Sequence, residues 1–404
     1  MAKFAQMPAV IAMVTRSGAV GVNFAVIAGL AAGLGFDDFG RVVLVWSGAT
    51  VCAPCIGAGV PLILLDAVSK RHGLHRGVIL RMIFVWPAIL GASAYCLLSS
   101  VWPGYPWGAM ISAGYCINFL TCLASIMRAL GSVILSMVLR DACPHMALGF
   151  AAMTGSVDLI LPLACTAMIG MGGGALWWLW LHPERQVLLS GADISRKFAV
   201  SLWGTSVLGV VASQVDIIFG ESFLSPAQLG VYALLRRISN LVALPISVAT
   251  WVTAGAVATS HANADNRALQ NAIRNASIVA FFPGAALFAV AISISLWLAP
   301  DASVTGFVLL AGAFIQIIFA ATFTVATLCE CAHFAMMSRL LSIMAYGLIV
   351  IVGTIDTALS NAVAYVVAIA AGQLALWHLL RTRLGVDTSV WVLWRGRGAK
   401  WSLS

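Results

Sequence analysis

The sequence has 404 residues, of which 61% are hydrophobic and only 9% are charged, and its formal net charge is +8. Soluble domains usually carry about 25% charged and about 45–50% apolar residues, so this composition excludes a water-soluble globular protein. Apolar runs of about 20 residues recur along the whole sequence, which predicts a polytopic membrane protein.

Taken in chain order, the apolar runs predict an all-α fold of about twelve transmembrane helices. No connecting loop is long enough to fold as a globular domain, which argues against an enzyme with a soluble catalytic module. Only about 38 residues are available for the fifth and sixth spans together. The spans are expected near residues 12–34, 41–66, 78–100, 107–128, 144–162, 164–181, 198–219, 229–256, 277–298, 303–328, 338–354 and 358–379.

The loops between the predicted spans alternate in charge. The positive-inside rule places the basic loops and both termini in the cytoplasm. Because the positive charge is concentrated in these loops, it indicates membrane orientation rather than nucleic-acid binding. The basic set contains Lys70, Arg71, Arg76, Arg185, Arg196, Lys197, Arg267, Arg274, Arg339, Arg381, Arg383, Arg395, Arg397 and Lys400. The acidic set contains Asp37, Asp38, Glu221, Asp301 and Asp356, with Arg41 as its only cation.

Two similar stretches indicate an internal duplication. GFDDFGRVVLVWSG joins the first two spans, and LSPAQLGVYALLRR joins the seventh and eighth about 190 residues later. An even number of spans per half gives parallel repeats, one of the two symmetric plans of secondary transporters. We therefore expect a six-helix lobe at 1–184, a cytoplasmic linker at 185–197, a second six-helix lobe at 198–380 and a cytoplasmic basic tail at 381–404.

Four of the predicted spans carry small and polar residues on one helical face. Such a face meets water, a ligand or another helix rather than lipid, although small-polar stripes also mediate close helix packing without further function. The stripes comprise Arg16 and Asn23 in span one, Gly114, Asn118, Thr121, Ser125 and Arg128 in span four, Ser206, Gly209, Ser213 and Asp216 in span seven, and Arg236, Asn240, Ala243, Ser247, Thr250 and Ala254 in span eight.

Arg236 and Arg237 interrupt the apolar run QLGVYALLRRISNLVALP. They lie roughly 9–10 Å into a helix that begins at Gly230, on the outer side, where cations are disfavoured. An arginine at the centre of a span costs about 2.5–3.5 kcal/mol on insertion scales, so a functional role is expected. Adjacent residues point about 100° apart, and periodicity favours Arg236 for the polar face. Outward snorkelling is the alternative for one of them.

The candidate substrate-binding residues follow from these stripes. Arg16 and Arg128 lie near cytoplasmic helix ends, where snorkelling to the interface is the alternative. The full set is Arg236, Arg237, Arg16, Arg128, Asn240, Asn23, Ser247 and Asn118.

Asp216 and Asp158 are the acids predicted to lie within the membrane. A carboxyl group there pairs with an arginine, stays neutral, or holds a proton or cation. Asp216, on a polar stripe, is the stronger candidate for coupling, and its alternative role is to neutralise an arginine of span eight.

The cysteine motifs are interpreted as structural. Nine cysteines are scattered among apolar residues. CAPC at Cys52–Cys55 and CECAH at Cys329–His333 have redox or metal-ligand spacing, but they lie in apolar sequence without a βαβ context. We expect neither a metal nor a cofactor.

The order of several loose motifs resembles the polysaccharide-transporter branch of the multidrug/oligosaccharidyl-lipid/polysaccharide exporter superfamily. DIIFGESFLSPAQLGVYALLRRISNLVALP matches its second-half pattern at Asp216, Gly230, Tyr232 and Arg237. GLGFDDFGRVV and GAGVP resemble the first half, and IMRALGSVILSMVLRD is similar to the stretch after span four in O-antigen flippases of the Wzx type. The family pattern selects Arg237, whereas periodicity selects Arg236, so both stay candidates.

This resemblance implies two six-helix lobes around a central cationic cavity in the bacterial inner membrane. It also implies transport of undecaprenyl-pyrophosphate-linked sugars, with a polysaccharide polymerase and chain-length proteins as further partners. Arginine is suited to such a substrate because its planar fork binds phosphate oxygens in pairs.

Two other functions are open. A cation-coupled multidrug exporter of the same superfamily is expected to line its cavity with acids, which are scarce in these spans. A polyprenyl-lipid enzyme, such as a polymerase, normally needs a sizeable outer loop. The sequence predicts no loop of that size.

Overall fold

The structure is a computed structural model that describes residues 2–69, 76–181, 196–353 and 357–394. Over these residues every regular element is a helix, and twelve helices are long and apolar enough to cross a membrane. The predicted all-α, polytopic membrane fold is therefore confirmed. The chain divides into two compact units, residues 1–218 and 219–404.

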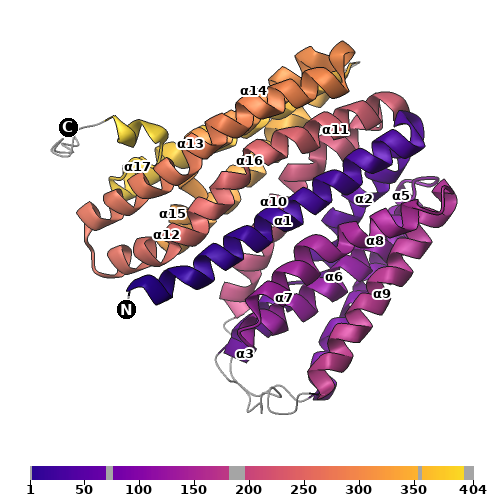
Figure 1. Cartoon of the computed structure of the whole chain (residues 1–404), viewed down its shortest axis with the longest axis horizontal. Helices are drawn as coiled ribbons and strands as arrows, with labels where there is room; N and C mark the ends of the chain where they lie inside the picture. The colour runs from indigo at the N-terminus through magenta and orange to yellow at the C-terminus, as the bar shows by residue number, and fades with distance from the viewer. Residues whose placement is uncertain (1, 70–75, 182–195, 354–356, 395–404) are drawn as a thin grey trace. The chain divides into compact units, whose positions relative to one another are not determined.

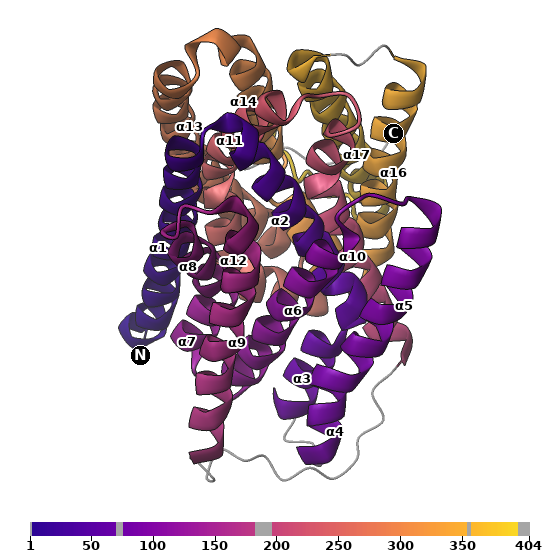
Figure 2. The same cartoon turned by 90° about the vertical axis from the view of Figure 1, so that its right-hand side faces the viewer.

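The first unit is a helical bundle in which α6 packs against most of the other helices (Figures 1 and 2). In both views α8 and α9 run beside each other. Its elements are α1 (Ala2–Leu34), α2 (Phe36–Gly57), α3 (Val60–Ser69), α4 (Arg76–Leu80), the π-helix η1 (Arg81–Val85), α5 (Trp86–Val101), α6 (Trp107–Ala129), α7 (Val133–Met137), the π-helix η2 (Val138–Ala142), α8 (Cys143–Ala152), α9 (Val157–Leu181) and α10 (Arg196–Gly220).

The second unit is built mainly from two helical hairpins, α12 with α13 and α16 with α17, together with α11 and α14. Its elements are α11 (Pro226–Val242), α12 (Leu244–Ala262), α13 (Asn266–Leu298), the short η4 (Pro300–Ala302), α14 (Ser303–Ile318), α15 (Thr322–Leu328), α16 (Ala332–Val352), α17 (Ala358–Leu384) and η5 (Val390–Leu393).

Each π-helical turn in the first unit is followed closely by a proline. η1 precedes Pro87 and η2 precedes Pro144, which are near the starts of α5 and α8. Proline has no N–H group and its ring crowds the carbonyl four residues earlier. A wider π turn relieves that crowding while the helix continues, so the third and fifth spans stay continuous.

The fifth and sixth spans differ from the sequence prediction. They were expected at 144–162 and 164–181, but the structure places them at Val133–Ala152 and Val157–Leu179. The turn between them lies at residues 153–156. The fifth span therefore starts earlier than predicted, and it includes Arg140 and Asp141, which form an ion pair with each other within the helix.

Several predicted features lie outside the described residues. Of the predicted linker at 185–197, only residues 196 and 197 are described. Lys70, Arg71 and Asp356 also lie outside the described residues. Of the predicted tail at 381–404, residues 381–394 are described. Within that part, Val386 and Val392 are buried against α12, α13, α15, α16 and α17 rather than extended from the last helix.

Candidate functional sites

The first candidate site lies in the second unit, on α11. This helix begins with a capping box, in which Ser225 and Gln228 bond each other's backbone N–H groups, and with Pro226 in its first turn. These residues fix the start of the helix. Arg236 then lies on a buried face of α11, with 4% of its surface exposed.

Neutral oxygens surround the Arg236 guanidinium. Its Nη1 donates to Asn240 Oδ1 at 2.5 Å and to Ser239 Oγ at 3.3 Å, and Nη2 donates to the hydroxyl of Tyr365 on α17. The Tyr365 ring centroid also lies 4.2 Å from Arg236 Cζ. These contacts hold the guanidinium in place and do not themselves cancel its charge, because all three acceptors are uncharged.

The other predicted residues of α11 and α12 lie on different surfaces. Arg237 is half-buried, Asn240 is exposed and Ser247 is half-buried. The Ser247 hydroxyl donates to the backbone of Leu244 at 2.8 Å. Thr250, on the same stripe, contacts Thr324 Oγ1 of α15 at 2.9 Å. The polar stripe of span eight therefore contacts neighbouring helices of its own unit at two points, Tyr365 and Thr324.

The second candidate site lies in the first unit, where α1, α6 and η2 pack together. The chain leaves α6 through a tight turn at Gly131, which has φ +82° and donates to the Arg128 carbonyl. That backbone conformation favours glycine. After this turn α7 and η2 run back along α6 and pack against it.

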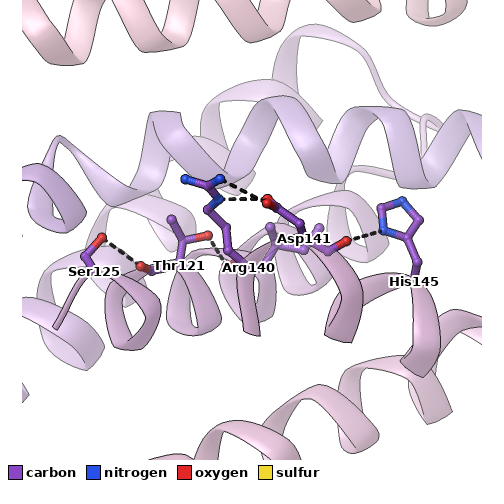
Figure 3. A network of polar contacts seen from close by, with 6 residues as sticks. Thr121, Ser125, Arg140, Asp141 and His145 are labelled. Atoms are coloured by element: carbon purple, nitrogen blue, oxygen red, sulfur yellow. Dashed lines mark hydrogen bonds and ion pairs between the residues drawn. The ribbon is translucent and has the colours of Figure 1, made fainter. Parts of the chain in front are cut away.

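Arg140 and Asp141 of η2 form a two-point ion pair (Figure 3). Arg140 Nε lies 2.7 Å from Asp141 Oδ1, and Nη2 lies 3.0 Å from Oδ2. The carbonyl oxygen of Asp141 lies 3.3 Å from His145 Nδ1. On the adjacent helix α6, the hydroxyls of Thr121 and Ser125 donate to backbone carbonyls of their own helix. Each hydroxyl oxygen keeps its acceptor capacity.

Arg16 of α1 and Arg128 of α6 complete this cluster. Arg16 is attracted electrostatically by Asp141 and repelled by Arg140 and Arg128. Arg128 lies in the last turn of α6, where the helix dipole favours a cation. Three guanidinium groups and one carboxylate give these four side chains a formal sum of +2, which favours the binding of an anion.

The remaining candidates in the first unit have more local surroundings. Asn23 is half-buried on α1, and its Oδ1 has no hydrogen-bond partner among the described residues. Asn118 is 2% exposed, and its side-chain amide lies directly against Gly57 of α2. Asp158 is exposed in the first turn of α9, and Asp216 of α10 is fully buried. Asp158 therefore lies at a helix terminus, whose dipole favours an acid.

The stripe predicted on span four thus has two roles. Gly114 and Asn118 pack against α2, since a Cβ on Gly114 would approach the Ala49 carbonyl oxygen to 2.9 Å. Thr121 and Ser125 lie on α6 beside Arg140 (Figure 3), and Arg128 is close enough to Arg140 for their charges to repel each other.

Sequence reasoning missed Arg140, Asp141 and Tyr365. Arg140 and Asp141 end the quoted segment IMRALGSVILSMVLRD, so an adjacent acid and base at a helical position was the available signal. Tyr365 gave no such signal, because its contact with Arg236 joins residues 129 positions apart.

The cysteine motifs form no metal cluster in the part of the chain that the structure describes. Burial raises the pKa of the Cys329 thiol to about 11, with a further contribution from Cys331. His333, which completes the CECAH segment, packs against Phe334 with ring centroids 4.0 Å apart.

Comparison with known proteins identifies the fold. No protein-family model and no curated protein matches the sequence. The chain is similar in structure to an inward-facing multidrug resistance MATE family transporter of the MOP superfamily, with a TM-score of 0.67, 14% identity, and coverage of 93% of this chain and 98% of that one. The outward-facing conformation of such a transporter gives a TM-score of 0.62, 15% identity, and coverage of 93% and 94%.

A third solved structure, MATE in complex with MaL6, gives a TM-score of 0.63 at 13% identity, with 93% of this chain and 96% of that chain covered. Together with the twelve spans, these matches show that the chain is a multi-pass membrane protein with the fold of MATE transporters of the MOP superfamily.

Proposed function

We propose that the protein is a flippase for lipid-linked oligosaccharide. It moves an undecaprenyl-pyrophosphate-linked repeat unit of O-antigen, capsule or exopolysaccharide from the cytoplasmic to the periplasmic leaflet by alternating access. The observation that carries the proposal is the cluster of Arg16, Arg128 and Arg140 around the single carboxylate of Asp141. Charges within membrane spans are costly, and their retention there marks a functional pathway.

The chemistry of the cluster suits a pyrophosphate. A guanidinium presents two parallel N–H groups to phosphate oxygens, and charge-assisted hydrogen bonds are about twice as strong as neutral ones. Asp141 already binds the fork of Arg140, so Arg16 and Arg128 are the groups we assign to the substrate phosphates. Asn23, on the same helix as Arg16, has a buried oxygen that suits a sugar hydroxyl.

A second anion contact is assigned to α11. Arg236 is positioned by Ser239, Asn240 and Tyr365, which orients its guanidinium before any ligand binds. Preorganisation of this kind lowers the entropic cost of binding. Arg237, half-buried on the neighbouring face, is the other candidate on this helix.

A cation-coupled multidrug exporter is the second candidate, because the similar structures are multidrug resistance transporters. A cluster with three arginines repels a cationic drug, which favours an anionic substrate instead.

The deciding experiment is a gene deletion with two readouts. We expect the deletion strain to accumulate lipid-linked oligosaccharide on the cytoplasmic leaflet and to lose surface polysaccharide, with unchanged drug susceptibility. Increased sensitivity to cationic drugs together with normal surface polysaccharide would instead support the multidrug exporter.

A further inference from the structure

Arg339 lies inside the eleventh membrane span, although the charge pattern of the sequence predicted it in a basic loop. It is the eighth residue of α16, roughly 10 Å from the start of that helix, and its side chain is half-buried. In the duplication predicted from the sequence, the eleventh span corresponds to the fifth. Arg140 is likewise the eighth residue of the fifth span, which begins at Val133. The two units therefore carry an arginine at equivalent positions.

The sequence around Arg339 differs from that around Arg140 in its acids. Arg140 is followed by Asp141, whereas Arg339 is followed by Leu340. The helices α11 to α17 contain no aspartate or glutamate. No carboxylate of these helices therefore cancels the charge of Arg339. A cation retained within a membrane span marks a functional site, and its charge favours an anionic ligand.

A ring contact holds the Arg339 guanidinium at about the depth of its own backbone. Its Cζ lies 4.8 Å from the centroid of the Phe323 ring on α15. The helices α15 and α16 pack against each other, and Phe323 precedes Cys331 in the turn between them by the same eight residues by which Arg339 follows it. A snorkelling arginine extends toward the end of its helix. Arg339 instead stacks on a ring at its own level, which argues against a simple interface anchor.

The face of α15 that Arg339 contacts is accessible. Four other residues of this short helix are buried, namely Thr322, Thr324, Val325 and Ala326. Phe323 is half-buried and Thr327 is exposed. Residues four apart share a helical face, so Thr327 lies one turn after Phe323 on the side of Arg339. Its hydroxyl donates to the Phe323 carbonyl at 2.7 Å, and a hydroxyl hydrogen can rotate to donate to a ligand instead.

α15 is also the second part of an interrupted helix. α14 ends at Ile318 and α15 begins at Thr322, and the turn between them contains neither proline nor glycine. The sequence of this turn, Phe-Ala-Ala, does not itself break a helix, so packing imposes the interruption. Discontinuous helices typically form the substrate and ion sites of secondary transporters. The position of Phe323 and Thr327 on such a helix therefore favours a binding role.

We propose that Arg339, Phe323 and Thr327 form a phosphate-binding site in the second unit. The guanidinium donates two parallel N–H groups to phosphate oxygens, the Phe323 ring fixes its plane, and the Thr327 hydroxyl donates a further hydrogen bond. The ligand is the pyrophosphate group of the transported lipid, so its identity rests on the proposed function. Each unit then has its own phosphate contact.

The test measures how pyrophosphate protects a reporter cysteine in the full chain, purified in neutral detergent. In a cysteine-free background, Met336→Cys places the thiol one turn before Arg339 on the same helical face, without replacing a residue of the site. We expect inorganic pyrophosphate to slow alkylation of this cysteine in a saturable way. Chloride at the same ionic strength should not do so, because it reproduces only the screening of charge.

The deciding variants are Arg339→Gln and Arg339→Lys in the same background. Arg339→Gln should raise the pyrophosphate concentration for half-protection roughly ten- to a hundredfold. Arg339→Lys should raise it by less, because lysine keeps the charge but loses the planar fork. The matched control, Arg267→Gln, removes an exposed arginine from the first turn of α13 in the same unit and should keep the native value.

The proposal is overturned if Arg339→Gln keeps the native half-protection, if Arg267→Gln loses as much, or if phosphatidylglycerol protects the cysteine and pyrophosphate does not. These outcomes are separate from those of the gene deletion. Protection that depends on Arg339, together with normal surface polysaccharide in the deletion strain, would keep the phosphate site and reject the flippase. Loss of surface polysaccharide without such protection would keep the flippase and reject this site.

Discussion

Arg140 and Asp141 are neighbours in the chain and yet bind each other through two parallel hydrogen bonds, at 2.7 and 3.0 Å, inside the fifth membrane span. In a regular α-helix adjacent side chains point about 100° apart, so this pairing is unusual. Both residues lie in the π-helical turn of η2, and π turns are frequent at functional sites. Because Asp141 neutralises Arg140, the fifth span contains an arginine and still has no net charge from this pair.

The first prediction concerns that pair. Asp141→Asn should destabilise the protein by about 1–2 kcal/mol, less than the 3–5 kcal/mol typical of a fully buried pair, because the two side chains are partly exposed. The double variant Arg140→Gln/Asp141→Asn should regain most of this loss. Thermal unfolding in detergent measures both. Strictly additive effects in the double-mutant cycle would show that the two residues do not interact energetically.

The second prediction concerns Arg16 and Arg128. Replacing either by glutamine should weaken substrate capture roughly ten- to a hundredfold, because a charge-assisted contact to a phosphate contributes about 1.5–3 kcal/mol. Complementation of surface polysaccharide in a flippase-deletion strain, with protein levels measured alongside, tests this.

Arg41→Gln is the matched control for that experiment. Arg41 is exposed and pairs with Asp37 at 3.2 Å, four residues earlier on the same helix. It should complement fully. If the Arg16 and Arg128 variants also complement fully, singly and together, the two arginines are interface anchors.

The third prediction concerns the positioning of Arg236. Arg236→Lys keeps the charge but loses the planar fork, so its activity should fall between that of the native protein and Arg236→Ala. Tyr365→Phe removes only the hydroxyl that accepts from Nη2, and it should weaken capture by less than Arg236→Ala. Arg237→Ala should differ from Arg236→Ala in size, because the two residues lie on different faces of α11. Complementation by the double alanine variant at native levels would exclude a role for either arginine in substrate binding.

The fourth prediction concerns Asp216. This carboxyl is fully buried, so water and ions have no direct access to it in this conformation. We therefore expect it to balance a buried cation, and Asp216→Asn should lower the yield of folded protein. Under the sequence-based hypothesis, Arg236→Gln or Arg237→Gln in the same background should restore part of that yield. Normal expression with loss of gradient-dependent transport would identify Asp216 as the coupling site instead.

The fifth prediction concerns orientation. In a cysteine-free background, a cysteine at position 301 should react with an impermeant maleimide from outside intact cells, since Asp301 is exposed between α13 and α14. A cysteine at position 72 should react only after permeabilisation. The reverse pattern would place both termini outside the cytoplasm.

Most of the secondary structure was predictable from the sequence, because the hydrophobicity of a span is a property of its own residues. The exceptions were local. Pro245 near the start of α12 divides the span predicted at 229–256 into α11 and α12. The fifth span begins eleven residues earlier than predicted, at Val133 rather than 144, and it contains the ion pair of Arg140 and Asp141.

The sequence by itself determined that this is an all-α protein with twelve membrane spans, and it identified Arg16, Arg128 and Arg236 as polar residues within them. Only the tertiary structure decided which of these residues meet. Arg16 lies near Asp141, and Arg236 lies beside Tyr365, because helices distant in the chain pack together. The same holds for Asp387, which is buried and accepts a hydrogen bond from Trp377 Nε1 at 2.9 Å. The hydrophobicity of a segment depends only on its own residues. An ion pair or a hydrogen bond between distant residues requires two groups to lie within about 3 Å of each other, and only the packing of the helices brings them that close.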